Sequence, residues 1–471
     1  MSTPLYNNQQ RVFALNFFSN LASSKYGTEA ELQAELNLRL RAMLSNQSVV
    51  DRIDTWAIVW GPVVYQSPEE KLKVATNAMY VAFNQESNQY VVAIAGTNPI
   101  STYGWFTEDF DVRTSVPWPY ATPTGYSPRI SNGTSIGVGI LLNTMKSNGA
   151  GLQAFLTSTL AQAKSPVEVI VTGHSLGGAL SASVALALFN LQGQWDPGHL
   201  ATVSALPSAG ATPGNADFSR YFGDSLGLRT IRVWNRLDVV PHAWQLDMLE
   251  AVPSLYWPYL VAGSLVQAFV GLAVASSLAG SGGPFSGDRY LQLLPQTPGL
   301  AGQVNITATY VPASEVFQFT VDLIVKGLLK RLGVPPFIED ALVAVLNLVL
   351  ARIDTTSTLE EILEWLELEL EKIPLIGKYI PEIIRLMSLI LKLLSELYVF
   401  LVQLGYQHVE AYFELEGIPD LPPLMKSINP ENAKALDFIP ALPQIEERLL
   451  TNLNRVLTEE FKQATGLVLR V

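Results

Sequence analysis

The chain has 471 residues, of which 48% are hydrophobic and only 15% are charged, so it must bury a large core or keep apolar surface for a partner. Its net charge of −12 argues against nucleic acid as a partner, because phosphates need a basic surface, and against electrostatic docking on anionic lipid. The absence of cysteine excludes disulfides, thiolate chemistry and cysteine-based metal sites.

The N-terminal segment shows no sign of a secretory leader. Residues 1–11 are polar, and no apolar stretch with a small-residue cleavage site follows them. We therefore expect a cytoplasmic protein. Export, or a mature form whose leader has been removed, is the alternative, and the sequence leaves the oligomeric state open.

The first half of the chain predicts strands that alternate with helices. The polar stretch Asn84–Asn88 separates two apolar runs and predicts a hairpin. Such alternation favours a doubly wound α/β layer. The expected elements are helices within 11–47, strands over 54–65 and 78–96, a helix over 152–163, a buried strand over 167–172, a helix over 179–191, and strands over 200–205 and 228–234.

The second half is apolar and predicts helices. No charged residue occurs from Ala251 to Gly287. The stretch Tyr259–Leu278 is long enough for a transmembrane helix, but Gln267 and several Ser and Gly residues dilute it, so a buried or interfacial pair of helices is favoured. Further helices are expected over 315–332, 337–353, 358–372 and 382–404.

The clearest chemical signal lies at residues 173–178, which read Gly-His-Ser-Leu-Gly-Gly and contain the pattern Gly-x-Ser-x-Gly. An apolar strand precedes this pattern and an alanine-rich helix follows it. In that context the serine is exposed on a sharp turn, and the flanking glycines let strand and helix backbones pass closely. We therefore predict Ser175 as a nucleophile, with a purely structural turn as the alternative.

A serine hydroxyl needs a general base, and the chain has only four histidines. His174 adjoins Ser175, and its side chain should point away from the nucleophile's face of the turn. His199 lies in a loop that should fall at the wrong end of the sheet. His408 is therefore the predicted base, with His242 as the alternative candidate.

The base needs a carboxylate that fixes its tautomer and stabilises the imidazolium. Asp238 follows the expected strand over 228–234 and is well placed to meet a histidine on another loop. The alternative is a loop carboxylate that caps the next turn. The order Ser175, Asp238, His408 is that of α/β-hydrolases, so the predicted fold is an α/β-hydrolase sheet.

Negative charge that develops on a carbonyl oxygen needs preorganised donors. One predicted donor is the backbone N–H of Leu176, the residue after the nucleophile. The other is Thr97, which follows an early strand and offers both its N–H and its hydroxyl. An ordinary turn is the alternative interpretation of the Gly-Thr-Asn-Pro segment.

Together these residues resemble the class 3 lipase family, the fungal-type lipases. The resemblance covers residues 75–245 and 400–415. It implies an α/β-hydrolase fold, a Ser/Asp/His triad, no cofactor and no metal, and acylglycerol-like esters as substrates. The matching pieces, in the family's order, are Ala95-Gly96-Thr97, Trp105 with Asp109 and Asp111, the Gly-His-Ser-Leu-Gly-Gly turn, Pro213-Gly214-Asn215 with Phe218, Asp238-Val239-Val240-Pro241, and His408 with Tyr412.

The sequence departs from the family's pattern in four ways. Ala95 stands where the family usually has arginine or another bulky residue, and the strand before Pro213 is atypical. The family's usual short lid, expected near 99–118, is not clearly amphipathic here. Asp238 and His408 are 170 positions apart, far more than in the family.

That long segment predicts an inserted cap. We expect residues 1–245 to form the hydrolase core with nucleophile, oxyanion loop and acid, and 246–400 to form a mostly helical, apolar cap. Residues 401–471 would return to the core with the catalytic histidine and C-terminal helices. The expected helix over 382–404 is apolar around most of its circumference, so it must be buried or face lipid. A helical subdomain that packs only on itself is the alternative.

The expected activity is hydrolysis of lipid carboxylic esters at an interface, as by a triacylglycerol lipase or esterase that forms an acyl-enzyme. The cap would supply hydrophobic contact with a membrane surface. One alternative is a phospholipase A-type acyl hydrolase. Another is a lipid-binding or membrane-acting protein that retains the hydrolase fold without turnover.

Overall fold

The computed structural model describes residues 3–23, 25–70, 73–98, 111–120, 122–283, 286–305, 364, 368 and 400–436. The chain divides into two compact units. Unit 1 comprises Met1–Val252, Ala273–Gln303 and Gln407–Ala441, and unit 2 comprises Pro253–Leu272, Val304–Tyr406 and Leu442–Val471. The expected boundaries at 245 and 400 stay a prediction, since most of residues 246–400 lie outside the described part.

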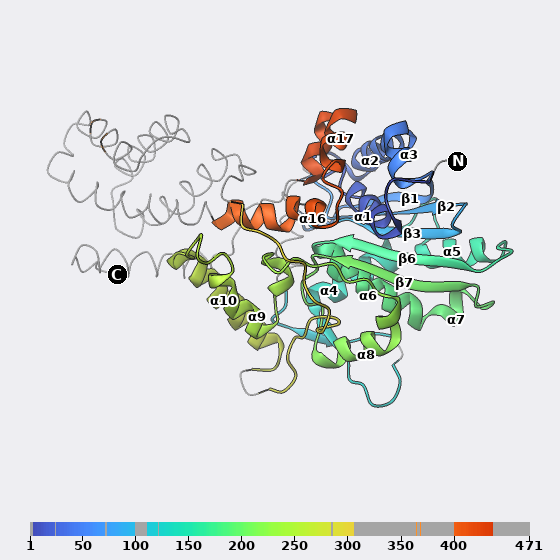
Figure 1. The fold of residues 1–471 in the computed structure, drawn as a ribbon. Coiled ribbons are helices and arrows are strands. Elements are labelled where there is room, and N and C mark those ends of the chain that lie inside the picture. The colour runs from blue at the N-terminus through green and yellow to red at the C-terminus, as the bar shows by residue number, and fades with distance from the viewer. Residues whose placement is uncertain are drawn as a thin grey trace. The chain divides into compact units, whose positions relative to one another are not determined.

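A five-stranded mixed sheet runs through unit 1 in the order β1-β2-β3-β6-β7 (Figure 1). The first three strands pair antiparallel, whereas β3, β6 and β7 pair parallel. This mixed sheet with its helices confirms the expected α/β class. The strands are β1 Ala57–Tyr65, β2 Asn77–Asn84, β3 Gln89–Ile94, β6 Val167–His174 and β7 Ala201–Ser208, with a separate pair of β4 Ser115–Pro117 and β5 Arg129–Ser131.

The expected hairpin joins β2 and β3. Asn84 pairs with Gln89, and the tight connection between them places Asn88 at φ 54°, a left-handed conformation that asparagine tolerates better than most residues. β6 lies between β3 and β7 and is almost wholly buried, which explains its continuous apolar sequence.

The prediction of a strand over 228–234 is wrong. The segment makes isolated parallel bridges to β7, at Ala205–Thr230 and Ser208–Val233. The β7 carbonyls of Ala205 and Pro207 accept N–H groups from this segment, but Pro207 has no N–H to reach the carbonyl of Ile231. The missing donor interrupts the ladder, and the sheet ends at β7.

Helices cover both faces of the sheet (Figure 1). Successive side chains of a strand point to opposite faces. Gly173 lies against Gly177 of α6, while the ring of His174 packs on Phe17 of α1. The helices of this part are α1 Asn8–Phe18, α2 Glu29–Ser45, α3 Gln47–Ile53, α4 Asn132–Gly139 with a π-helical continuation over Ile140–Thr144, α5 Leu152–Leu160, α6 Leu176–Asn190, α7 Gln192–Trp195 and α8 Ala216–Leu226.

Helix α6 is the centre of the core. Thirteen of its residues, from Leu176 to Leu188, are buried. Small side chains, above all alanine, let the helix lie close to the parallel strands, and the longer ones fill the space between helix and sheet. The helix thus holds the turn that precedes it, which carries the predicted nucleophile, against the rigid middle of the sheet.

In its described part, the uncharged run after Ala251 contains one α-helix, α10 Ser264–Gly280, and a short 3-10 helix over Val252–Ser254, so the expected pair of helices is wrong. Pro253 and Pro258 lack the N–H that a continuing α-helix needs, and a 3-10 turn followed by turns connects α9 Leu246–Ala251 to α10. Within the described residues, no helix is long and apolar enough to cross a membrane.

The last described segment, residues 400–436, is mostly helical. It comprises a helix over 400–408, α16 Glu410–Leu415, α17 Leu421–Ile428 and a 3-10 helix over Pro430–Leu436. The expected cap helices before residue 400 and the expected C-terminal helices after residue 436 lie outside the described residues. Most of the expected short lid near 99–118 does so as well.

Candidate active site

Ser175 sits on a sharp turn between β6 and α6. Its backbone adopts φ 62° and ψ −127°, a sparsely populated conformation for a residue with a side chain. A Cβ on Gly173 would lie 2.0 Å from the carbonyl oxygen of Gly177, and a Cβ on Gly177 would lie 2.5 Å from that of Ile94. Only glycine fits at either flank, so the surrounding backbone holds the strained serine in place.

The loop after β3 touches the same turn. A Cβ on Gly96 would lie 3.3 Å from the Cβ of Ser175, and the Gly96 N–H donates to Asn20 Oδ1 at 3.0 Å. Thr97 follows directly and is buried. The two predicted oxyanion donors therefore flank the serine, Leu176 in sequence and Thr97 on the contacting loop; their role stays a prediction.

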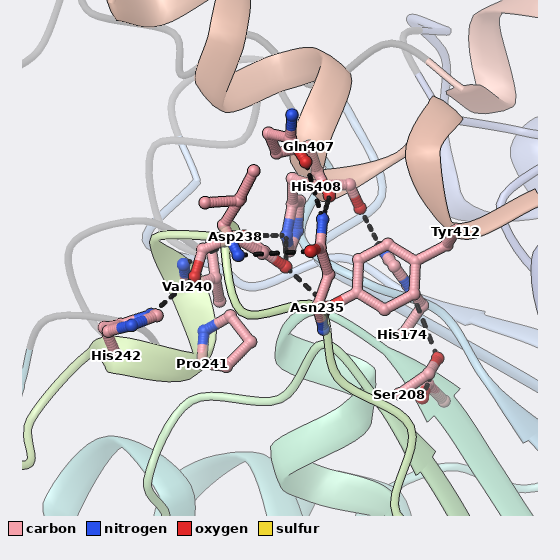
Figure 2. A network of polar contacts seen from close by, with 12 residues as sticks. His174, Ser208, Asn235, Asp238, Val240, Pro241, His242, Gln407, His408 and Tyr412 are labelled. Atoms are coloured by element: carbon pink, nitrogen blue, oxygen red, sulfur yellow. Dashed lines mark hydrogen bonds and ion pairs between the residues drawn. The ribbon is translucent and has the colours of Figure 1, made fainter. Parts of the chain in front are cut away.

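Asp238 and His408 meet although they are 170 residues apart (Figure 2). His408 Nδ1 lies 2.8 Å from Asp238 Oδ2 and 3.0 Å from Oδ1, and both side chains are fully buried. Because a carboxylate accepts, Nδ1 carries a proton, which leaves Nε2 as the nitrogen that can act as a base. The backbone N–H of Val240 also donates to Asp238 Oδ1, at 3.0 Å.

Tyr412 is a further partner of the acid. Its hydroxyl donates to Asp238 Oδ2 at 2.8 Å and accepts the Asn235 N–H at 3.0 Å. Burial, followed by the Asp238 carboxylate, raises the pKa of Tyr412 well above its usual value, so the hydroxyl stays a donor. Sequence reasoning noted Tyr412 only through the family resemblance; its spacing of four residues from His408, about one helical turn, was the available signal.

His174 belongs to the site, although sequence reasoning assigned it no role. Its Nε2 lies 2.7 Å from the backbone carbonyl oxygen of His408, and its Nδ1 lies 3.2 Å from Ser208 Oγ. Burial lowers the pKa of His174 well below its usual value, and the neighbouring His408 lowers it further. A neutral imidazole therefore lies beside the predicted base.

The other two histidines sit differently. His242 Nδ1 contacts the backbone carbonyl of Asp238 at 2.7 Å, whereas the Asp238 carboxylate faces His408. Burial is the main cause that lowers the pKa of His242. His199 is exposed and precedes β7, at the amino end of the parallel strands, while Ser175 follows the carboxyl end of β6. This geometry favours His408 over His242 as the base.

Other pieces of the family pattern shape the surrounding backbone. Asn215 caps α8 by accepting the Phe218 N–H at 2.8 Å, and it also accepts the Arg129 N–H at 2.9 Å. Gly214 is needed because a Cβ there would lie 2.3 Å from the Arg129 carbonyl oxygen. Trp105 and Asp109 lie outside the described residues. In the part of the chain that the structure describes, no cluster of three acidic or histidine side chains is arranged to hold a metal.

Comparison with known proteins points to one family. The model of the family described as lipase (class 3) matches residues 91–248. Among solved structures, M37 lipase is 30% identical, with a TM-score of 0.54, and the match covers 64% of this chain and 87% of that one. No curated protein matches the chain.

Two fungal enzymes match less closely. A fungal lipase in complex with an inhibitor is 20% identical, with a TM-score of 0.34, over 50% of this chain and 75% of that one. A lipase from Rhizopus microsporus var. chinensis is 15% identical, with a TM-score of 0.34, over 51% of this chain and 70% of that one.

Proposed function

This chain belongs to the class 3 lipase family, and from that membership we propose that it hydrolyses acylglycerol esters with Ser175, His408 and Asp238 as its catalytic triad. The family makes it a lipase-like ester hydrolase; the triad, the acyl-enzyme and the acylglycerol substrate are the proposed part. The observation that carries the triad is the buried pair of His408 and Asp238 beside the strained turn of Ser175.

In the first half of the reaction, the Ser175 hydroxyl attacks the ester carbonyl while His408 Nε2 takes its proton. Asp238 holds the imidazole through Nδ1 and stabilises the imidazolium that forms. The N–H groups of Leu176 and Thr97, with the Thr97 hydroxyl, hold the negative oxygen of the tetrahedral intermediate. His408 then gives the proton to the departing alcohol, and the acyl group stays on Ser175.

In the second half, His408 takes a proton from water, and the resulting hydroxide attacks the acyl carbonyl in the same oxyanion site. The acid product leaves as the proton returns to Ser175. Asp238 takes no proton in either half; it orients the imidazole and stabilises its charge. Tyr412 and the Val240 N–H support that role by donating to its two oxygens.

The test is Ser175→Ala. Without the nucleophile, kcat on p-nitrophenyl butyrate should fall by about four orders of magnitude or more while the thermal unfolding midpoint is kept. A fluorophosphonate probe should label the unsubstituted protein and leave the variant unlabelled. His242→Gln serves as the control and should be labelled. Esterase activity above a few per cent in the Ser175→Ala variant would refute the triad.

We further propose that the segment around Trp257 contacts the lipid surface. Trp257, Tyr259 and Val261 are 70%, 68% and 69% exposed, and they lie in the run from 251 to 287 that carries no charge. Tryptophan and tyrosine have an apolar ring with a polar edge, which suits the boundary between water and lipid. Their exposure in an uncharged segment supports contact with a neutral ester surface.

Replacing all three residues by serine should lower activity on emulsified tributyrin about tenfold and leave hydrolysis of soluble p-nitrophenyl acetate unchanged, because apolar burial drives adsorption. Adsorption of the unsubstituted protein should persist at about 0.5 M NaCl, since no charge takes part. The matched control replaces the exposed Tyr26, Leu38 and Leu228 by serine. Equal losses in both triple variants, or on both substrates, would contradict the proposal.

A further inference from the structure

The predicted base is far from the other triad residues in the sequence. His408 lies 170 residues after Asp238, and the chain re-enters unit 1 at Gln407, the residue just before it. The bonds from Asp238 hold the imidazole ring, but they do not by themselves hold the backbone that carries it. Something must fix that backbone relative to Ser175.

Two side chains hold this backbone, each through a hydrogen bond to a backbone carbonyl at the point where the chain re-enters unit 1 (Figure 2). His174 Nε2 lies 2.7 Å from the His408 carbonyl oxygen. Asn235 Nδ2 donates to the Gln407 carbonyl at 3.1 Å and to Gln407 Oε1 at 2.7 Å. One anchor adjoins the nucleophile, and the other lies three residues before the acid.

The direction of the His174 bond follows from its partners. A carbonyl oxygen only accepts, so Nε2 must carry the proton. Because burial keeps the ring neutral, Nδ1 is an acceptor and faces the Ser208 hydroxyl at 3.2 Å. That hydroxyl donates to the Gly173 carbonyl at 3.1 Å and accepts from Asn16 Nδ2 at 3.2 Å. The His408 carbonyl, which can only accept, is therefore the partner that sets the tautomer of His174.

Packing keeps the His174 ring from turning away. Its ring centroid lies 4.7 Å from that of Phe17, 4.8 Å from that of His408 and 5.1 Å from that of Tyr412, whose ring is nearly perpendicular to it. His174 is only 4% exposed. Since His174 precedes Ser175 directly, its hydrogen bond ties the base to the nucleophile's own peptide.

We infer that His174 is a positioning residue of the hydrolytic site and that Asn235 assists it. This inference rests on the proposed function. By holding the carbonyls of His408 and Gln407, the two side chains set the approach of His408 to Ser175 locally, independently of the 169 residues between Asp238 and His408. A misplacement of about 1 Å in such a group can cost as much as 100-fold in rate.

The matched test is His174→Gln against His174→Asn. Both introduce a neutral amide, but the longer glutamine places its N–H near the position of Nε2, whereas asparagine reaches only the position of Nδ1. We expect His174→Asn to lower kcat on soluble p-nitrophenyl acetate about 10- to 100-fold with KM unchanged, and His174→Gln to stay within about threefold. The rate of fluorophosphonate labelling should fall in the same order.

A purely structural role would lower the unfolding midpoints and the activities of both variants together. Equal kcat values for the two amides, or a change in KM alone, would overturn the inference. If His174→Asn does not fold, Asn235→Ala provides the second measurement: kcat should fall with KM unchanged, and an unchanged kcat would overturn it. Failure of the probe to label the unsubstituted protein would instead refute the proposed function.

Discussion

At the scale of single residues, the strained serine depends on glycines that have no room for a side chain. Of the two glycines that flank Ser175, Gly173 is the more crowded, because a Cβ there would lie 2.0 Å from the backbone of Gly177. Backbone cannot rotate away as the end of a side chain can, so strand or helix would have to shift. The Gly-x-Ser-x-Gly spacing is therefore a steric requirement of the turn.

Gly173→Ala should lower the free energy of unfolding by at least about 2 kcal/mol, at the upper part of the usual range for overpacking. Urea denaturation with linear extrapolation measures it. The matched control is Gly193→Ala in α7, where a new Cβ meets nothing within 4 Å and the helix should gain up to about 1 kcal/mol. Similar losses in both variants would show that the contact with Gly177 is not the cause.

At the scale of elements, α4 packs on α6 through a close pair. Gly137 of α4 lies against Leu180 of α6, and a Cβ on Gly137 would come within 2.7 Å of Leu180 Cδ2. Leu180 is fully buried. The two helices thus pack closely because Gly137 of α4 has no side chain at the place where the Leu180 side chain of α6 extends.

This fit predicts a compensating pair of substitutions. Leu180→Ala alone should cost about 2–5 kcal/mol by leaving a cavity, and Gly137→Ala alone about 1–3 kcal/mol by crowding Leu180. In the double variant the new methyl group enters the space that Leu180 leaves, so the combined loss should be smaller than the sum. A double-mutant cycle in urea measures the coupling, and strict additivity would contradict the packing described.

At the scale of the whole molecule, buried neutral histidines make stability depend on pH. Burial lowers the pKa values of His174 and His242 below their usual 6.5, that of His174 by the larger amount. In the unfolded chain these groups bind protons as the pH falls below about 6.5, whereas in the folded protein they remain neutral to lower pH. The unfolded state then binds more protons, so acid favours unfolding.

The free energy of unfolding should therefore decrease from pH 7 to pH 5, with each such histidine contributing up to about 1.4 kcal/mol per pH unit. His174→Gln should flatten this slope, because the amide does not titrate, while the exposed His199→Gln serves as the control. Urea unfolding at pH 7, 6 and 5 gives the slopes. The same slope in the His174→Gln variant and the unsubstituted protein would contradict a buried neutral His174.

The amino-acid sequence determined the local features of this protein. The apolar run before Gly173 and the alanine-rich run after Ser175 predicted a strand, a turn and a helix, and the structure has β6, that turn and α6 in this order. The polar Asn84–Asn88 stretch predicted the hairpin of β2 and β3 for the same reason: turn chemistry and periodicity act between close neighbours in the chain. With few histidines in the chain, elimination left His408 as the predicted base.

Tertiary structure alone decided what depends on partners far away in the chain. Pro207 interrupts a ladder that the segment 228–234 would otherwise form, and sequence periodicity does not say which strand lies opposite which. The role of His174 is likewise invisible locally, because its partner is a backbone carbonyl 234 residues away, and every residue type carries that group. Hydrogen bonds to backbone leave no sequence signature at the accepting end, so only the fold reveals them.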